Sequence, residues 1–423
     1  MRRFIQPFAI SIGIGLLTPG CRQPEPIGQP QTKSVSIALD QSKLAEVDEE
    51  INEAITEGKC PGGVLLFDHK GEQVLRTYGN RALVPAVEPA TADTIYDMAS
   101  LTKVVATAPA ILKLIEQGKL ALDDKVQQHI AEFKGDGKEE IIVRQLVAHT
   151  SGLRPGLGRR PEWKGAAKAI EFACGEKLQT PPDTKFRYSD INYILLGEIV
   201  RRVSGEDLHA FTQRELYGPM KMTDTGFLPD PKLKPRIAPT EQLGATNILR
   251  GIVHDPTSRR MEGIAGHAGL FSTAADLARY VKMILNQGTI DGVQVFKPES
   301  IKLMTEWQTP NTINEVRGLG WDIDTAYSSP RGKLFPGGSF GHTGWTGTSI
   351  WIDPYSRSFF IFLSNRNHPK GGAVVPLRKR ISTLLAESIP NGDVYFGLSS
   401  YLPNFPVKEK LASKKVLNGI DVL

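Results

Sequence analysis

Two pairs of β-rich segments, one near each end of the chain, constrain its fold more than any other feature. Residues 63–69 and 72–79 are rich in apolar and β-branched side chains and flank a two-residue turn, a pattern typical of a β-hairpin. A similar pair, residues 348–354 and 359–366, follows roughly 270 residues later. Both pairs fit into one sheet, with the middle of the chain packed beside it as a helical lobe over about residues 123–260. We therefore predict an α+β fold, an antiparallel β-sheet flanked by helices with an inserted helical lobe.

Helical periodicity marks both ends of the folded domain. Apolar residues recur every three or four positions from Leu44 to Ile55 and stop at Gly58, which indicates an amphipathic helix. Residues 374–387 also have a helical pattern. We place the domain at residues 42–400.

The first 21 residues read as an export signal. Two arginines precede an apolar run from about Phe8 to Leu17, which is well short of the roughly 20 residues that a membrane span needs. The segment is similar to a bacterial lipoprotein signal, with Cys21 as the lipidation site, and a Pro- and Gln-rich linker follows at residues 22–41. A cleaved leader with an incidental cysteine and an uncleaved anchor are the alternatives. In each case we predict export to the bacterial envelope or periplasm, with membrane contact only through the leader or a lipid anchor.

Charge and cysteine content exclude several classes of function. Lys and Arg total 51 against 46 for Asp and Glu, and the net charge of +5 is spread along the chain instead of gathered in a block. This distribution argues against a nucleic acid partner. The three cysteines have neither the pattern of a disulfide framework nor the spacing of a zinc site, and we expect no metal and no cofactor.

A serine and a lysine form the candidate catalytic pair. Apolar residues from Val104 to Ile115 lie on one face of a predicted helix, with Ser100 and Lys103 at its start. A spacing of three places both side chains on one face, and the helix N-terminus offers unpaired N–H groups where an oxyanion would develop. A buried lysine whose charged form is disfavoured can serve as the base for a serine nucleophile. The other interpretation is a Ser100 that only caps the helix beside a solvated Lys103.

Five motifs in order along the chain give this pair a context. They are YDMASLTK (96–103), LVAHTSGL (146–153), FRYSDINYILLGEIV (186–200), GHAGLFSTAADLARY (266–280) and GHTGWTG (341–347). Together they resemble the serine β-lactamase and penicillin-binding protein superfamily, and within it the class C β-lactamases, esterases and D-stereospecific peptidases. The resemblance spans roughly residues 43–390.

The resemblance implies roles for further residues. Tyr188 would move the proton between the nucleophile Ser100 and the leaving group, together with Lys103. Which of Lys103 and Tyr188 accepts the proton first stays open. The backbone N–H groups of Ser100 and Trp345 would form the oxyanion hole.

Two residues depart from the family pattern. Asp190 stands where the family more often has Asn, and an ionised carboxylate cannot donate to a substrate amide, so Asn192 is the candidate to supply that group. His342 stands where Lys is usual; with Thr343 it would meet a substrate carboxylate, while Gly344 lets the backbone approach closely. An unperturbed imidazole is largely charged only below roughly pH 6.5. We therefore expect weak β-lactamase activity, and tighter binding of carboxylated substrates below that pH.

Other motif residues are expected to be structural. His149 and Ser151 lie in the HTSG turn, and His267 lies in a loop. GGSFG (337–341) matches the nucleophile elbow of α/β-hydrolases, with Ser339 at its centre, but that motif needs a following helix and a strand pattern follows here. The α/β-hydrolase hypothesis therefore fails on context.

The sequence, with the resemblance, predicts a serine hydrolase that acts through an acyl-enzyme on amide or ester bonds. Cell-wall D-alanyl peptides and small esters fit, as for a DD-carboxypeptidase or esterase, and the partner is a small molecule or a peptidoglycan peptide. The alternative is a catalytically inactive module that recognises penicillin and acts as a sensor. Residues 401–423 form a polar connector that ends in VLNGIDVL, which is similar to the start of an exo-β-N-acetylmuramidase domain.

Overall fold

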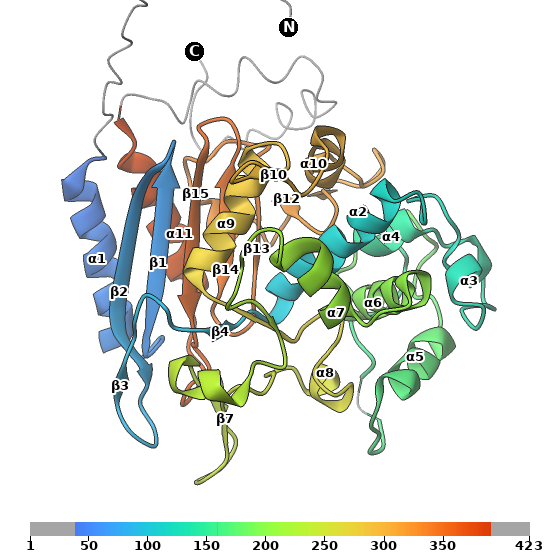
Figure 1. Cartoon of the computed structure of the whole chain (residues 1–423), viewed down its shortest axis with the longest axis horizontal. Helices are drawn as coiled ribbons and strands as arrows, with labels where there is room; N and C mark the ends of the chain where they lie inside the picture. The colour runs from blue at the N-terminus through green and yellow to red at the C-terminus, as the bar shows by residue number, and fades with distance from the viewer. Residues whose placement is uncertain (1–38, 159, 391–423) are drawn as a thin grey trace, which may run out of the picture. The chain divides into compact units, whose positions relative to one another are not determined.

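An antiparallel sheet is the centre of the fold (Figure 1). The computed structural model describes residues 39–158 and 160–390, and in them this sheet has eight strands. The first and last of the long strands are neighbours, with Leu65 opposite Phe362. The single sheet built from both chain ends is thus confirmed. Its order is β11 (Val316–Arg317), β12 (Asp322–Asp324), β13 (Phe340–Thr343), β14 (Ser349–Asp353), β15 (Ser358–Ser364), β1 (Gly62–His69), β2 (Glu72–Ala82) and β3 (Glu88–Pro89).

Successive side chains of the central strands enter two different hydrophobic layers. Leu65 belongs to a core shared with α1 (Gln41–Thr56) and α11 (Val375–Glu387), the two helices predicted at the ends of the domain. Val64 points to the opposite face, against which α9 (Ala274–Leu285) packs (Figure 1). Because both faces of the sheet are covered, β1 is buried along its whole length.

The middle of the chain forms the predicted helical lobe beside the sheet (Figure 1). Its central helix α6 (Asp190–Ser204) contacts α4 (Val143–Val147) and α5 (Ala166–Gly175) within the lobe and also α2 (Ala108–Glu116). The helices are α2 (Ala108–Glu116) and, in the lobe, α3 (Val126–His129), α4 (Val143–Val147), α5 (Ala166–Gly175), α6 (Asp190–Ser204), α7 (Leu208–Thr212) and α8 (Pro256–Arg260). Shorter elements are β4 (Tyr96–Asp97), β5 (Gly226–Phe227), β6 (Glu241–Gln242), β7 (Ile248–Leu249), β8 (Leu270–Ser272), β9 (Thr289–Ile290), β10 (Val293–Gln294) and α10 (Pro298–Thr305).

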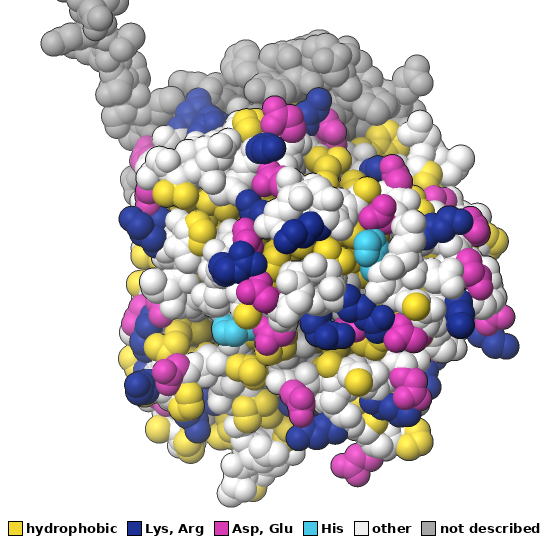
Figure 2. All heavy atoms as spheres, turned by 45° about the vertical axis from the view of Figure 1, so that its right-hand side comes forward, with side chains coloured by type: hydrophobic (Ala, Val, Ile, Leu, Met, Phe, Trp, Pro, Cys, Tyr) yellow, Lys and Arg dark blue, Asp and Glu magenta, His cyan; other side chains and the backbone are white. Residues whose placement is uncertain are grey.

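Charges of both signs are interspersed over the face of the molecule that includes the lobe (Figure 2).

Among the described residues, no helix combines the length and the apolar character that crossing a membrane requires. The predicted signal, the lipidation site Cys21 and the C-terminal connector lie outside the described residues, and these features stay predictions.

Candidate active site

The segment that carries Ser100 is not one regular helix. After β4 it forms a 3₁₀ turn at Ala99–Leu101 and a π-helical turn at Lys103–Thr107, and α2 begins only at Ala108. Ala99 has a φ of +46°, in the left-handed region that residues other than glycine rarely adopt. The helix predicted from Ser100 onward is present, but its first turns are 3₁₀ and π instead of α, and the left-handed Ala99 directly precedes Ser100. The spacing of three still brings Ser100 and Lys103 together.

The Lys103 ammonium group contacts three acceptors. Its Nζ lies 3.0 Å from Ser100 Oγ, 3.0 Å from the backbone oxygen of His267 and 2.7 Å from Oδ1 of Asp190. The contacts to Ser100 and His267 are hydrogen bonds, and the contact to Asp190 is an ion pair whose Oδ1 receives no hydrogen bond of normal geometry. This arrangement matches the protonated form of Lys103.

Burial and neighbouring groups act on Lys103 in opposite directions. The side chain is fully buried, which by itself lowers its pKa. The charge of Asp190 and the interactions with Tyr188 and Asp190 outweigh this effect and raise the Lys103 pKa above its ordinary value. The resting site therefore holds an ammonium, which must lose a proton before it can accept one from Ser100.

Tyr188 lies beside this pair, two residues before α6. The centre of its ring is 5.0 Å from Lys103 Nζ. The rings of His149 and Tyr327 pack against it, with centroid distances of 4.5 Å and 5.7 Å. The structure thus brings together the predicted residues Ser100, Lys103 and Tyr188.

Ser100 and Tyr188 line a cavity of about 360 Å³, which is within the size range of small-molecule sites. The end of β13 and the residues after it form one wall. All of the residues that the sequence placed there line it, namely His342, Thr343, Gly344 and Trp345. The other lining residues are Arg317, Asp322, Tyr327, Arg366, Ala373, Val374, Val375 and Arg378.

Gly344 is needed where this wall meets the segment before Ser100. A Cβ at Gly344 would lie 2.1 Å from Thr348 Oγ1 and 2.5 Å from the backbone oxygen of Met98. The predicted close approach is therefore made to the protein's own backbone. It brings the backbone of Trp345 next to the nucleophile segment.

His342 lines the cavity as a neutral group. Its side chain is buried, and burial, reinforced by the charges of Arg317 and Lys103, holds its pKa well below the usual value. The expectation that His342 becomes a cation near pH 6.5 is therefore wrong. Its Nδ1 lies 2.9 Å from the backbone oxygen of Thr343, which leaves its ring as a fixed part of the wall.

Three arginines supply the positive charge instead. Arg317 on β11, Arg366 after β15 and Arg378 on α11 all line the cavity. Burial lowers the pKa of Arg378 to about 9, so its guanidinium is still charged at neutral pH. These residues were not predictable from the sequence, because no motif or spacing connects them and only the folded sheet brings them together.

Asp190 and Asn192 do not occupy the positions expected of substrate-binding groups. Asp190 pairs with Lys103 and is not part of the cavity lining. Asn192 is fully buried, where its Oδ1 accepts a hydrogen bond from Ser151 Oγ at 2.7 Å and its Nδ2 lies 3.4 Å from His149 Nδ1. The hypothesis that Asn192 offers its amide to a substrate is wrong, because that amide holds the HTSG turn in place.

Two histidines of the motifs, His149 and His267, contact residues of the site without lining its cavity. His149 accepts a hydrogen bond at Nδ1 from the backbone N–H of Ser189 and packs on the ring of Tyr188, so it contacts a candidate catalytic residue although it lies in a structural turn. His267 is buried, and its Nε2 lies 2.9 Å from Asp255 Oδ1. Ser339 is buried and donates to the backbone oxygen of Pro336, which agrees with rejecting it as a nucleophile.

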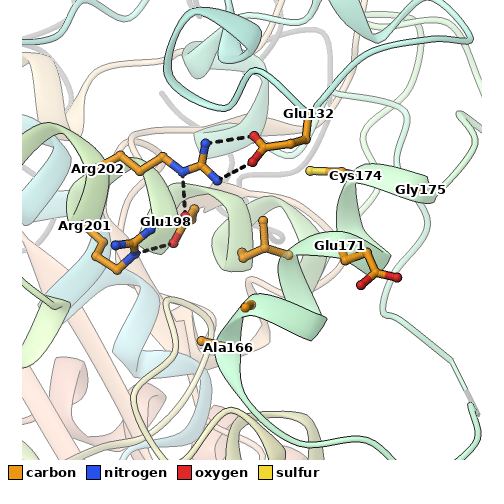
Figure 3. A pocket seen from close by; sticks show the side chains of 10 residues that line it. Glu132, Ala166, Glu171, Cys174, Gly175, Glu198, Arg201 and Arg202 are labelled. Carbon is orange, nitrogen blue, oxygen red and sulfur yellow. Dashed lines mark hydrogen bonds and ion pairs between the residues drawn. The ribbon is translucent and has the colours of Figure 1, made fainter.

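A larger cavity, of about 750 Å³, lies between α5 and α6 in the lobe (Figure 3). Four of its charged side chains pair with one another, since Arg202 bridges Glu132 and Glu198 and Arg201 also pairs with Glu198, while Glu171 pairs with Lys168 outside the lining. The Cys174 thiol is there as well, but burial raises its pKa to about 11. Because this cavity lacks an activated nucleophile, the smaller cavity at Ser100 is the candidate active site.

Because the His342 imidazole is buried and neutral, it should add nothing to the pH dependence of substrate binding. We expect the Kd of a peptide ending in a free carboxylate to follow the same pH profile in wild-type His342 and in His342→Asn between about pH 5 and 8, because the imidazole does not titrate there. Isothermal titration on a Ser100→Ala background measures this without turnover. Binding that tightens several-fold in acid for His342, but not for Asn, would contradict the buried neutral state.

Comparisons with known proteins agree with this architecture. The family model described as Beta-lactamase matches residues 47–384. The chain is 34% identical over 363 residues to the "N-acetylmuramyl-L-alanine amidase" of Bacillus subtilis (strain 168), which covers 77% of this chain and 81% of that protein. It is 34% identical over 326 residues to the "Putative D-alanyl-D-alanine carboxypeptidase" of Escherichia coli (strain K12), with coverages of 69% and 74%. A solved structure described as a class C beta-lactamase superposes with a TM-score of 0.67 at 19% identity over 83% of this chain and 97% of that chain, which shows a shared fold.

Proposed function

The chain belongs to the β-lactamase family, and from that premise we propose that it is a serine hydrolase that forms an acyl-enzyme on Ser100 and cleaves amide bonds of cell-wall peptides. The observation that carries the proposal is the 3.0 Å contact between Ser100 Oγ and the buried Lys103 Nζ, at a cavity lined by arginines. A substrate of this kind is met outside the cytoplasmic membrane, which agrees with the predicted export signal.

In the proposed reaction, Ser100 Oγ attacks the carbonyl carbon of the substrate amide and its proton passes to Lys103 or Tyr188. The backbone N–H groups of Ser100 and Trp345 hold the oxyanion that forms. The C–N bond then breaks and the amine leaves with the proton. Water hydrolyses the resulting ester and restores Ser100.

The charge of the cavity supports a substrate with a carboxylate near the cleaved bond. Arg317, Arg366 and Arg378 face the same space, and Asp322 is the acidic side chain that lines it. Arg317 Nη1 lies 3.7 Å from Asp322 Oδ1. The guanidinium groups of Arg366 and Arg378 therefore have no acidic partner among the residues that line the cavity. Arginine matches the planar geometry of a carboxylate. A peptide that ends in D-alanine presents such a group next to the scissile bond.

A second candidate is the amide between an N-acetylmuramyl group and L-alanine, the bond named for the Bacillus subtilis relative. It is favoured by the exposed aromatic side chains at the cavity, because Trp345 is 65% and Tyr327 is 55% exposed. The Trp345 ring is held in place by the guanidinium of Arg366, 4.6 Å from its centre. A pyranose ring has an apolar C–H face that packs on an aromatic surface of this kind.

The test is a substrate panel read by mass spectrometry. A pentapeptide ending in D-Ala-D-Ala, an N-acetylmuramyl-L-alanyl peptide, a p-nitrophenyl ester and a fluorescent penicillin are each incubated with the wild type and with Ser100→Ala. We expect D-alanine release from the pentapeptide, a Ser100 adduct with the ester and slow turnover of the penicillin. Cleavage of the muramyl amide alone would favour the second candidate. Noncovalent penicillin binding with no adduct or turnover on any substrate would instead support the sensor alternative and refute the proposal.

If an arginine of the cavity binds the substrate carboxylate, its removal should slow the cleavage of carboxylated substrates more than that of neutral ones. Hydrogen bonds to charged groups contribute about 1.5–3 kcal/mol, or about 10- to 150-fold. Arg366→Gln should therefore lower kcat/KM for the D-alanyl peptide by about tenfold more than for the neutral ester. Arg380→Gln is the matched control, because Arg380 lies on α11 and pairs with Glu50 on the surface. An equal loss for peptide and ester would show that Arg366 does not recognise the carboxylate.

A further inference from the structure

Asp97 holds together three segments that meet at Ser100, and we propose that it is a positioning residue of the active site. It is buried at the end of β4, three residues before the nucleophile. Its Oδ1 accepts a hydrogen bond from the backbone N–H of Ala99 at 2.8 Å, and its Oδ2 accepts one from the N–H of His254 at 2.6 Å. Its own backbone oxygen accepts a hydrogen bond from Thr346 Oγ1 at 2.7 Å. The inference rests on the proposed function, because it assumes that Ser100 is the nucleophile.

The first contact fixes the nucleophile. Ala99 adopts a φ of +46°, which is unfavourable for a residue with a Cβ. The hydrogen bond from its N–H to Asp97 holds it in that conformation. Without this acceptor, Ala99 is free to relax, and Ser100 would turn away from Lys103.

The second contact reaches Lys103. Residue 254 begins the segment that contains Asp255, whose Oδ1 lies 2.9 Å from Nε2 of His267. The backbone oxygen of His267 in turn accepts a hydrogen bond from Lys103 Nζ. Asp97 therefore positions the segment that orients the lysine.

The third contact reaches the proposed oxyanion hole. Thr346 directly follows Trp345, and Thr348 Oγ1 donates to the backbone oxygen of Met98 at 3.2 Å. These bonds join the segment after β13 to the residues before Ser100. The backbone N–H of Trp345 is thereby held at a fixed place relative to the nucleophile.

The environment of Asp97 adds a pH dependence. Burial raises its pKa to about 6, the negative charge of Asp255 acts in the same direction, and the two N–H donors and Arg259 oppose it. His254 contacts Asp97 only through its backbone N–H; burial lowers the pKa of its imidazole, whose Nε2 lies 3.1 Å from Glu241 Oε2. Below about pH 6, Asp97 gains a proton and becomes a weaker acceptor for both N–H groups.

A fluorophosphonate probe tests the inference without a known substrate, because it labels an activated serine directly. Asp97→Asn keeps the shape of the side chain but places an amide donor against an N–H donor. We expect at least a tenfold lower maximal labelling rate of the full chain with an unchanged concentration for half-maximal rate. The difference from the wild type should narrow below about pH 6, where the wild-type carboxylate also loses its charge.

Asp353→Asn is the matched control. Asp353 is also buried with its pKa raised to about 6, but its carboxylate accepts hydrogen bonds within the turn between β14 and β15, from Ser356 Oγ at 2.5 Å and the N–H of Tyr355 at 3.1 Å. Its labelling rate should stay within twofold of the wild type even if its melting temperature falls. Should Asp97→Asn fail to fold, Thr346→Val removes one Asp97 contact and should slow labelling several-fold.

Three results would overturn the inference. Wild-type labelling rates in both Asp97→Asn and Thr346→Val would show that Asp97 does not position Ser100. Equal losses in Asp97→Asn and Asp353→Asn would show a general effect on stability. A wild-type chain that does not label at all would refute the proposed function, and the positioning role with it.

Discussion

Ser100→Ala is expected to abolish turnover, and Lys103→Ala and Tyr188→Phe are each expected to remove most of it. The nucleophile oxygen lies 3.0 Å from the lysine nitrogen, and that nitrogen lies 5.0 Å from the centre of the tyrosine ring. Proton transfer by a positioned side chain contributes a factor of about 10²–10⁴. Tyr188→Phe, which removes only the hydroxyl, should lower kcat within that range.

The losses should not add. If the lysine and the tyrosine act as one proton-transfer unit, the acylation rate of the double variant Lys103→Ala/Tyr188→Phe should be little lower than that of the less active single variant. Pre-steady-state release of p-nitrophenol measures the acylation step, and mass spectrometry shows whether Ser100 carries the acyl group.

Tyr193→Phe is a stringent control for this experiment. The Tyr193 ring is 5.8 Å from Lys103 Nζ and packs on His149, as the Tyr188 ring does, but its hydroxyl donates to the backbone oxygen of Val147. We expect nearly wild-type acylation in this variant. Near wild-type rates in Tyr188→Phe as well would show that the assignment of Tyr188 is incorrect.

The sheet and its covering helices were predictable because their signals are local. Residues 63–69 and 72–79 form β1 and β2 around the expected turn, and the helix expected from Leu44 becomes α1. The start of the nucleophile segment was not predictable in the same way. The left-handed Ala99 donates its N–H to Asp97, and nothing in the spacing of apolar residues reveals this conformation or this hydrogen bond.

The residues of the candidate site also fall into two groups, those predictable from local motifs and those placed there only by the fold. Ser100, Lys103 and Tyr188 lie in recognisable motifs, and the structure brings them together. The arginines at the cavity come from β11, from the residue after Asn365 and from α11, so their shared location depends on pairing and packing between distant segments. The neutral state of His342 likewise depends on burial, which a motif does not encode.

Asp190→Asn is expected to accelerate acylation at neutral pH by about tenfold. Asp190 Oδ1 lies 2.7 Å from Lys103 Nζ, and its charge is the largest of the influences that raise the lysine pKa against the effect of burial. Without that charge, burial shifts Lys103 toward its neutral form, which can accept the Ser100 proton. A tenfold larger neutral fraction corresponds to about 1.36 kcal/mol.

The pH profile separates this effect from a change in substrate binding. If Lys103 is the base, its charged form limits the rate at low pH, and lowering its pKa moves the rising limb of the acylation rate toward lower pH. The p-nitrophenyl ester, which has no charge to interact with Asp190, is the suitable substrate. Asp224→Asn serves as the control, because Asp224 pairs with Arg236 and takes no part in the contacts of Lys103.

The opposite result would identify a different role for Asp190. An acylation rate that falls in Asp190→Asn, with an unshifted pH profile, would mean that the carboxylate is needed to hold Lys103 Nζ against Ser100 Oγ more than to set its charge. The contact to the His267 backbone oxygen is then insufficient to orient the lysine. An aspartate in place of the family's usual asparagine would in that case serve orientation, and the proton of Lys103 would have to leave by way of Tyr188 or the substrate.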